Sequence, residues 1–418
     1  MLIKMEVESS YTGKLQVNVV TRENVPVRDA TVTIAASDSP NNIIERLTTN
    51  SSGQTEIVDL PAPPLELSLN EANTTRPYTT YNIRIEALGY ETEFIENAEI
   101  LPDVLAIQNV RLTSKNASLT EDIMIPDHTL YGEYPPKVPE EEIKPVNEPG
   151  EIVLSRVVVP EIIVVHDGVP SNNSAQNYYV NYRDYIKNVA SSEIYATWPT
   201  ATIEANVLAI MSFTLNRVYT EWYRNKGYDF TITSSTAYDQ KWIYGRNIFE
   251  SISLVVDNIF DQYLSRPDVR QPILTQYCDG KRVTCPNWLS QWGSCNLGER
   301  GYSTIEIIRY YYGDDMYINT AEQIAGIPIS WPGYDLDIGA SGQKVAQIQK
   351  QLDTIAQVYT AIPRLNADGI YGEVTREAVK AFQKIFDLPQ SGIVDFATWY
   401  KISQIYVGIT RIAEGIPR

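Results

Sequence analysis

The first quarter of the chain alternates between apolar and polar residues. Three segments place an apolar residue at every second position, the period of a β-strand with one buried face: 14–20, 30–34 and 81–87. Turn-forming runs such as Ser51-Ser52-Gly53 and Pro61-Ala62-Pro63-Pro64 stand between them. The pattern predicts a small antiparallel β-sandwich over residues 1–113.

A helical period replaces this alternation in the middle of the chain. Between residues 202 and 223 the apolar positions recur every three or four residues, as in an amphipathic helix: Ile203, Val207, Ile210, Met211, Leu215, Val218 and Trp222. Similar patterns predict helices over 248–264 and 304–312, and residues 156–165 are β-rich. We therefore predict an α+β domain over residues 156–325.

The last part of the chain, residues 333–418, contains three short helical patterns. They cover 343–354, 373–386 and the residues from Asp395 onward, and glycine-marked turns at 367–372 and 389–392 separate them. This spacing predicts a compact three-helix bundle. The whole chain is thus predicted to be multidomain.

A segment rich in proline and glutamate, residues 114–155, joins the first two predicted domains. Five prolines and six glutamates fall between Glu133 and Glu151. Such a composition does not supply enough apolar surface to form a core. We therefore predict an extended and exposed linker that is open to proteases.

Composition excludes several classes of function. The formal charge of −18 argues against a nucleic-acid partner, whose phosphates require a basic surface. No run of about 18 apolar residues predicts a membrane helix, and the first residues lack the apolar core of a signal peptide. The two histidines, His128 and His166, are not in a metal-ligand spacing, so we predict no metal and no other cofactor. Two of the three cysteines, Cys278 and Cys285, could pair, or all three could stay reduced.

Glu204 is the first candidate for chemistry. At 100° per residue it projects onto the apolar face of the predicted helix, among Leu208, Met211 and Leu215. A carboxyl removed from water in this way has a raised pKa and can act as a general acid near neutral pH. The alternative is a first-turn glutamate that complements the helix dipole.

The C-terminal motifs resemble the peptidoglycan-binding three-helix domain. The motif residues are Gly342, Val345, Ile348, Gln349, Leu352, 368–372, Thr375, Ala378, Val379, Phe382 and Gln383. The resemblance implies peptidoglycan as the partner, with Asp368 and Tyr371 at the binding surface. The first domain resembles, more loosely, the carboxypeptidase-regulatory-like sandwich, which has no catalytic residues.

The middle segment resembles SpoIID-type lytic transglycosylases in three elements that occur in the same order. These are 203–214 with Glu204, then Tyr238-Asp239-Gln240 with Tyr244-Gly245, and finally Ser290-Gln291-Trp292-Gly293 with the helix region 301–313. The resemblance implies Glu204 as the catalytic acid. It implies substrate binding by Tyr238, Asp239, Gln240, Tyr244, Ser290, Gln291, Trp292, Tyr302 and Tyr311. The Cys and His that SpoIID carries before its Gln element are missing here, where the sequence is 234–239, so no metal requirement is carried over.

The order of all four segments resembles the clostridial spore cortex-lytic enzymes of the SleC family. This resemblance implies a precursor, made in the mother cell without a signal peptide and stored in the outer spore layers. A subtilisin-like germination protease would activate it by removing the N-terminal region, with the cut in the linker. The implied reaction cleaves the glycosidic bond between N-acetylmuramic acid and N-acetylglucosamine and leaves 1,6-anhydro products. A glycoside hydrolase with Asp239 as second carboxylate, and a non-catalytic cortex-binding protein, remain as alternatives.

Overall fold

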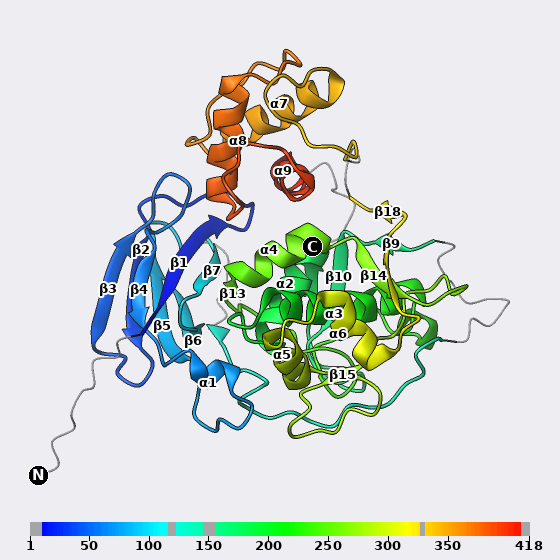
Figure 1. The fold of residues 1–418 in the computed structure, drawn as a ribbon. Helices are drawn as coiled ribbons and strands as arrows, with labels where there is room; N and C mark the ends of the chain where they lie inside the picture. Colours follow the sequence, from blue (N-terminus) through cyan, green and yellow to red (C-terminus); the bar gives the residue numbers. More distant parts are fainter. Residues whose placement is uncertain (1–10, 116–122, 145–155, 327–330, 411–418) are drawn as a thin grey trace, which may run out of the picture.

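The computed structural model describes residues 11–115, 123–144, 156–326 and 331–410. Figure 1 shows three parts: two β-sheets formed mainly by the first part of the chain, a mixed part built around several helices, and a group of three helices that lies against both. The chain is therefore a multidomain α and β protein with a helical C-terminal region.

The N-terminal part consists of two sheets with the strand orders β13-β7-β1-β4 and β3-β2-β5-β6-β8. Their bounds are β1 (Thr12–Thr21), β2 (Thr31–Ala36), β3 (Ile43–Thr48), β4 (Val58–Pro61), β5 (Thr79–Glu86), β6 (Glu93–Ile100), β7 (Leu105–Leu112), β8 (Ile123–Met124) and β13 (Ile248–Phe249). The three segments predicted as strands lie in β1, β2 and β5. Leu15, Val17 and Val19 of β1 are fully buried, because every second side chain points to the interior.

Two features of these sheets differ from the sequence prediction. β1 and β7 run parallel rather than antiparallel, because the chain passes through the second sheet between them and re-enters the first in the same direction. The edge strands β8 and β13 come from outside residues 1–113, and β13 pairs with β7 through Ile248 and Phe249. The middle part of the chain thereby completes a sheet of the N-terminal part.

The helix α3 (Thr200–Tyr219) lies at the centre of the middle part. It is surrounded by α2 (Tyr182–Glu193), α4 (Glu250–Ile259), α5 (Gln291–Glu299) and α6 (Thr304–Tyr312) (Figure 1). The remaining elements are β9 (Val158–Val159), β10 (Ile162–His166), β11 (Asn177–Asn181), the short 3-10 helix η1 (Arg224–Lys226), β12 (Ile232–Thr233), β14 (Gln262–Ser265), β15 (Tyr277–Cys278), β16 (Leu289–Ser290), β17 (Tyr317–Thr320) and β18 (Gln323–Ile324).

The predicted helices of this part are present, with two corrections to their ends. α3 stops before residue 223, because Glu221 adopts a φ of +46° that no right-handed helix can continue. α4 is shorter than 248–264, because the residues before it pair in β13 and those after it pair with β17. The prediction for 304–312 agrees with α6 at both ends.

Two helices, α2 and α5, were not predicted. In α2 the buried face includes Arg183 and Lys187, which hides the apolar period. Both cations pair with the single carboxylate of Asp257, whose Oδ2 lies 2.6 Å from Lys187 Nζ. In α5 the two glycines of the sequence Gln291–Glu299 weaken the helical signal.

The described half of the predicted linker, residues 123–144, is not an exposed spacer. Ile125, His128 and Leu130 are buried, and so are the side chains of Lys137 and Lys144. Lys137 Nζ donates to the carbonyl of Asp239 at 2.7 Å and lies over the ring of Tyr277. The prediction was wrong because polar residues can be buried when folded partners satisfy them, which composition does not reveal. Residues 116–122 and 145–155 lie outside the described residues.

The C-terminal region folds as α7 (Gln343–Ala356), α8 (Glu373–Ile385) and α9 (Phe396–Thr410), close to the predicted ranges. Val345, Ile348, Leu352, Ala378 and Phe382 form its core. α9 also packs against α4 of the middle part (Figure 1). No helix among the described residues is long and apolar enough to span a bilayer.

Candidate active site

Glu204 lies in the second turn of α3 and is half-buried. Its neighbours Ile203 and Ala205 are buried in the core, so the carboxyl emerges at the edge of the helix that faces α6. Glu204 Oε2 accepts a hydrogen bond of 2.5 Å from the hydroxyl of Thr304. Glu204 is thus only partly removed from water, because the start of α6 leaves part of the carboxyl open to solvent.

Thr304, which contacts Glu204, was not among the site residues predicted from the sequence. It is the first residue of α6, and a capping box formed by Ser303 and Glu306 satisfies the helix terminus. The hydroxyl of Thr304 is therefore available to Glu204. Its bond to Oε2 leaves Oε1 as the oxygen that can carry a proton towards a ligand. The capping-box pattern at Ser303 was the sequence signal for this position.

If Glu204 is the catalytic acid that the SpoIID resemblance implies, Thr304→Val should lower the turnover rate severalfold to about tenfold, because one hydrogen bond contributes about 1 kcal/mol to positioning. Thr304→Ser, which keeps the hydroxyl, should retain most of the rate. Initial rates of peptidoglycan solubilisation across pH, with circular dichroism to check folding, measure the effect. Equal rates for the Val and Ser variants would show that Thr304 does not position Glu204.

Ser290 and Tyr311 form a second group beside the helices α5 and α6. Ser290 caps α5, and its Oγ accepts from the backbone N–H of Gly293 at 2.9 Å. The Tyr311 hydroxyl also bonds Ser290, and burial raises the pKa of Tyr311 to about 12. A Cβ at Gly293 would lie 2.2 Å from the Tyr311 hydroxyl oxygen, so only glycine allows this approach. Tyr302, just before α6 in the sequence, is half-buried and packs against the hydrophobic core.

α5 is attached directly to the part of α3 that carries Glu204. Asn206 Nδ2 donates to Ser294 Oγ at 2.8 Å, and Thr202 Oγ1 donates to the Ser294 carbonyl at 3.1 Å. Asn206 and Thr202 flank Glu204 in the sequence. The structure thereby brings the element that contains Ser290 and the helix that contains Glu204 into one contact region.

The disulfide between Cys278 and Cys285 settles the open question about the cysteines. Cys278 pairs with Ser290 in the ladder of β15 and β16, so the closed loop supports the capping serine. Cys295 is free and buried, and burial raises the pKa of its thiol. No grouping of three or more His, Cys, Asp or Glu side chains suited to a metal ion occurs in the part of the chain that the structure describes.

Gln291 and Trp292, predicted as substrate-binding residues, lie in the interior. Trp292 is 3% exposed and packs against Trp198, with ring centroids 5.3 Å apart. Gln291 is fully buried, and its Nε2 lies 3.5 Å from Glu193 Oε2. Burial raises the pKa of Glu193. These side chains hold α5 and α2 together and have no surface to offer to a sugar.

Asp239 and Gln240 are also fully buried and do not lie beside Glu204. Asp239 Oδ1 accepts from Arg217 Nε at 2.7 Å, and Gln240 Oε1 accepts from the Thr214 hydroxyl at 2.8 Å. Arg217 is thirteen residues beyond Glu204 on α3, about 20 Å along the helix axis. Because both side chains are enclosed, the prediction that they bind substrate is wrong. Asp239 fixes the far end of α3, and Gln240 fixes its middle, where its Nε2 donates to the Ile210 carbonyl at 3.0 Å.

Tyr238 and Tyr244 are the exposed members of that predicted set, at 36% and 39%. Tyr244 stacks on Tyr178, with centroids 4.9 Å apart, and lines a cavity at the junction of the three parts. Neither tyrosine belongs to the group formed by Ser290 and Tyr311.

In the C-terminal region the two predicted binding residues have different environments. Asp368 is exposed and lines a 490 Å³ cavity at the start of α8. Hydrogen bonds from the Ile370 N–H and from Gln349 lower the pKa of Asp368. Tyr371 is only 1% exposed and its hydroxyl donates to the Gly392 carbonyl at 2.8 Å. The expectation that Tyr371 lies at the binding surface was wrong, because this ring is part of the core.

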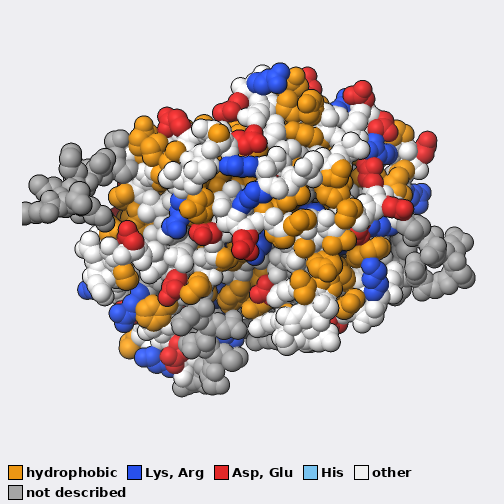
Figure 2. Space-filling view, turned by 90° about the horizontal axis from the view of Figure 1, so that it is seen from below, with side chains coloured by type: hydrophobic (Ala, Val, Ile, Leu, Met, Phe, Trp, Pro, Cys, Tyr) orange, Lys and Arg blue, Asp and Glu red, His pale blue; other side chains and the backbone are white. Residues whose placement is uncertain are grey.

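The helix α1 (Glu66–Leu69) and the loop after it contact the chain just before α3, the helix α5 and the disulfide loop. The indole N–H of Trp198, two residues before α3, donates to the Ser68 carbonyl at 2.9 Å. Asn296 of α5 donates to Glu71, and Lys281 in the disulfide loop donates to the Asn73 carbonyl. On the face that carries α1 and α5, acidic, basic and apolar side chains are intermixed (Figure 2).

Comparisons with known proteins identify one segment. Residues 341–402 match the family described as "Putative peptidoglycan binding domain". A search of curated proteins found no match.

Among solved structures, the SleB N-terminal domain is 26% identical over 18% of this chain and 99% of that chain, with a TM-score of 0.17. The Bacillus anthracis TIE protein is 13% identical over 25% of this chain and 17% of that chain, with a TM-score of 0.18. Catechol 1,2-dioxygenase from Acinetobacter sp. ADP1 is 11% identical over 28% of this chain and 58% of that chain, also with a TM-score of 0.18. With TM-scores this low, no argument rests on these similarities. The chain is thus a multidomain protein whose C-terminal helical region carries a peptidoglycan-binding domain, which supports peptidoglycan as its partner.

Proposed function

We propose that this protein is the precursor of a peptidoglycan lytic transglycosylase that acts on spore cortex, with Glu204 as its acid and base. The observation that carries the proposal is the placement of Glu204: a half-buried carboxyl, held by Thr304 through one oxygen, where α3 meets α5 and α6. The peptidoglycan-binding domain at 341–402 supports the choice of polymer. The SpoIID-like motifs support the choice of reaction.

The proposed reaction requires one carboxyl group and no water. Glu204 donates its proton to the glycosidic oxygen, so that the bond to C1 of the muramic acid breaks and the leaving sugar departs as an alcohol. The C6 hydroxyl of the same muramic acid then bonds to C1 and gives its proton to the Glu204 carboxylate. The product is a 1,6-anhydro sugar, and the enzyme returns to its initial protonation state.

The hydrolase alternative requires a second carboxylate to activate water or to attack the sugar. Asp239, the candidate for that role, is enclosed beside Arg217, Tyr223 and Thr233 at the far end of α3. This placement favours the single-acid mechanism. The non-catalytic alternative would have no need for an open carboxyl at Glu204.

The N-terminal part is proposed to act as an inhibitory pro-region. Ser68, Glu71 and Asn73 contact Trp198 just before α3, Asn296 of α5 and Lys281 of the disulfide loop. α3 carries Glu204, and Ser290 caps α5. A glycan strand that approached Glu204 from this side would meet these residues. We place the activating cut outside 123–144, because that segment is packed against the middle part and is a poor protease substrate.

Digestion of isolated cortex with the full chain and with protein trimmed before residue 123, which keeps the packed 123–144 segment, tests this proposal. We expect the trimmed protein to release fragments at least tenfold faster, and mass spectrometry to show 1,6-anhydro muramic acid ends. Reducing muramic acid ends would instead identify a hydrolase. Equal rates for both forms would remove the pro-region from the proposal, and a dye-release assay on folded, monodisperse samples of both forms controls for misfolding.

A further inference from the structure

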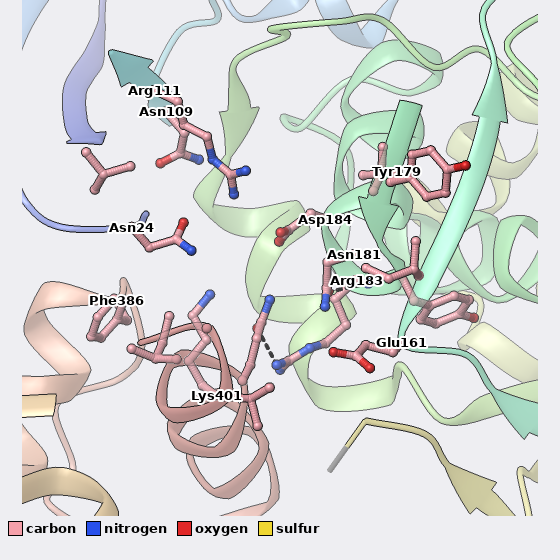
Figure 3. Close-up of a pocket in the computed structure, with 18 of the residues that line it drawn as sticks. Asn24, Asn109, Arg111, Glu161, Tyr179, Asn181, Arg183, Asp184, Phe386 and Lys401 are labelled. Carbon is pink, nitrogen blue, oxygen red and sulfur yellow. Dashed lines mark hydrogen bonds between the residues drawn. The ribbon is translucent and has the colours of Figure 1, made fainter. Parts of the chain in front are cut away.

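A cavity at the junction of the three parts has a volume of 730 Å³. Residues of β7, the start of α2 and α9 line it, so each of the three parts of the chain contributes a wall (Figure 3). This volume is within the range of small-molecule sites and is sufficient for one or two sugar rings. Glu204 does not line this cavity. The cavity at Asp368 in the C-terminal region is a separate one.

Lys401 and Arg111 supply positive charge from two of the walls. Among the described residues, neither cation has a carboxylate within 4 Å. Asp257, which lies near Lys401, is bound by Arg183 and Lys187. In Figure 3 both side chains reach towards the open space between β7 and α9. Burial lowers the pKa of Lys401 to about 8, which reflects the cost of holding this ammonium group without a close counter-ion.

The same cavity has an aromatic wall. Tyr178, Trp242 and Tyr244 pack together, with the ring centroids of Tyr178 and Trp242 5.1 Å apart. Such clustered rings offer flat apolar surfaces to the C–H faces of sugars.

Amide and carboxylate groups complete the lining. Asn109 and Asn24 lie near Arg111, and Asp184 and Glu161 lie on the side of α2 (Figure 3). Amide groups both donate and accept hydrogen bonds, and carboxylates accept them, so this set suits hydroxyl and acetamido groups.

We propose that this cavity binds a saccharide that carries a carboxylate, with Lys401 and Arg111 as partners of the carboxylate and the Tyr178, Trp242 and Tyr244 rings beside the sugar. Muramic acid, whose lactyl group is a carboxylate on a sugar ring, has this chemistry. The choice of ligand rests on the proposed function; the cavity itself does not include Glu204. Because β7 supplies Arg111, the site is complete only while the N-terminal part remains in place.

Calorimetric titration of the full chain with the disaccharide of N-acetylglucosamine and N-acetylmuramic acid tests the site. We expect Lys401→Met and Arg111→Gln each to weaken binding about tenfold or more, since each removes a hydrogen bond to a charged group. The unaltered protein should bind the lactyl amide of the same disaccharide as weakly as the two variants bind the acid. Arg111 is exposed, so its variant keeps the test valid if Lys401→Met does not fold.

The matched control is Lys350→Met, an exposed lysine of α7, which should leave the affinity unchanged. Asp368→Ala, in the separate C-terminal cavity, tests whether the disaccharide binds there instead. Loss of binding in Asp368→Ala alone, or equal affinity for the carboxylate and the amide, would overturn the proposal. If Glu204 proved not to be catalytic while Lys401→Met still weakened binding, this site would stand and only the proposed reaction would fall.

Discussion

Glu204→Gln is expected to lower the release of 1,6-anhydro fragments from cortex by about a hundred- to ten-thousandfold, the range attributed to a positioned general acid. Glutamine has the shape of glutamate and can still accept the hydrogen bond from Thr304 through its amide oxygen. It cannot donate a proton to the glycosidic oxygen and then recover one from the C6 hydroxyl. The loss should therefore appear in the rate, while the fold and the affinity for cortex remain.

The measurement compares initial rates of the trimmed protein and its variants on isolated cortex, with pull-down on cortex and thermal melting as checks. Glu299→Gln is the matched control, since Glu299 is an exposed glutamate at the end of α5, which packs against the helix of Glu204. We expect it to act at the normal rate. If Glu204→Gln retained activity, neither the transglycosylase nor a hydrolase using Glu204 could be maintained. A normal rate in that variant would also leave Thr304 without a catalytic partner.

Helix periodicity was the sequence signal that predicted best. α3, α6, α7 and α8 each bury a stripe of apolar side chains, so the spacing of residues such as Val207 and Phe382 locates them. α2 escaped because its interior contacts are ion pairs at Arg183 and Lys187, which look like a solvated surface in a sequence. Short β13 escaped because its partner, β7, is more than a hundred residues earlier.

The candidate site shows the limit of motifs without geometry. A motif gives the order of Asp239, Gln240 and Trp292 along the chain but not the direction in which each side chain points. All three are enclosed and support the scaffold. Glu204 could be placed on its helix from the sequence, whereas its contact with Thr304, a hundred residues later, depends on how α6 packs against α3.

Loss of the buried ion pairs of Arg217 is expected to have a large effect on the stability of the fold. Arg217 Nε contacts Asp239, and its two terminal nitrogens contact the two oxygens of Glu140 at 3.0 and 2.6 Å. The Arg217 side chain has no exposed surface. Arg217→Met would leave the buried Asp239 and the partly buried Glu140 without their guanidinium. We expect the free energy of unfolding to fall by about 3–5 kcal/mol, the cost of breaking a buried pair from one side.

Arg364→Met is the matched control. Arg364 also makes two hydrogen bonds to one carboxylate, that of Asp353, but its side chain is 62% exposed. An exposed pair contributes about 1 kcal/mol or less, so this variant should unfold almost like the unaltered protein. Urea unfolding followed by tryptophan fluorescence compares the two. Similar losses in both variants would show that burial does not set the strength of the Arg217 pairs.

The stability lost in Arg217→Met should depend on pH, in a direction set by the pKa of Glu140. Burial raises the pKa of Glu140, but the hydrogen bonds and charge of Arg217 and Lys144 outweigh burial and hold that pKa below its ordinary value of about 4.3. A lowered folded-state pKa stabilises the protein above the ordinary value, and this stabilisation is lost as the pH falls through the folded-state pKa. The difference between the unaltered protein and Arg217→Met should therefore be largest near neutral pH and shrink below about pH 4. Glu140 belongs to the 123–144 segment, and Arg217 belongs to α3, the helix of Glu204. If the stability difference stayed constant with pH, the segment would not be held to α3 by charge.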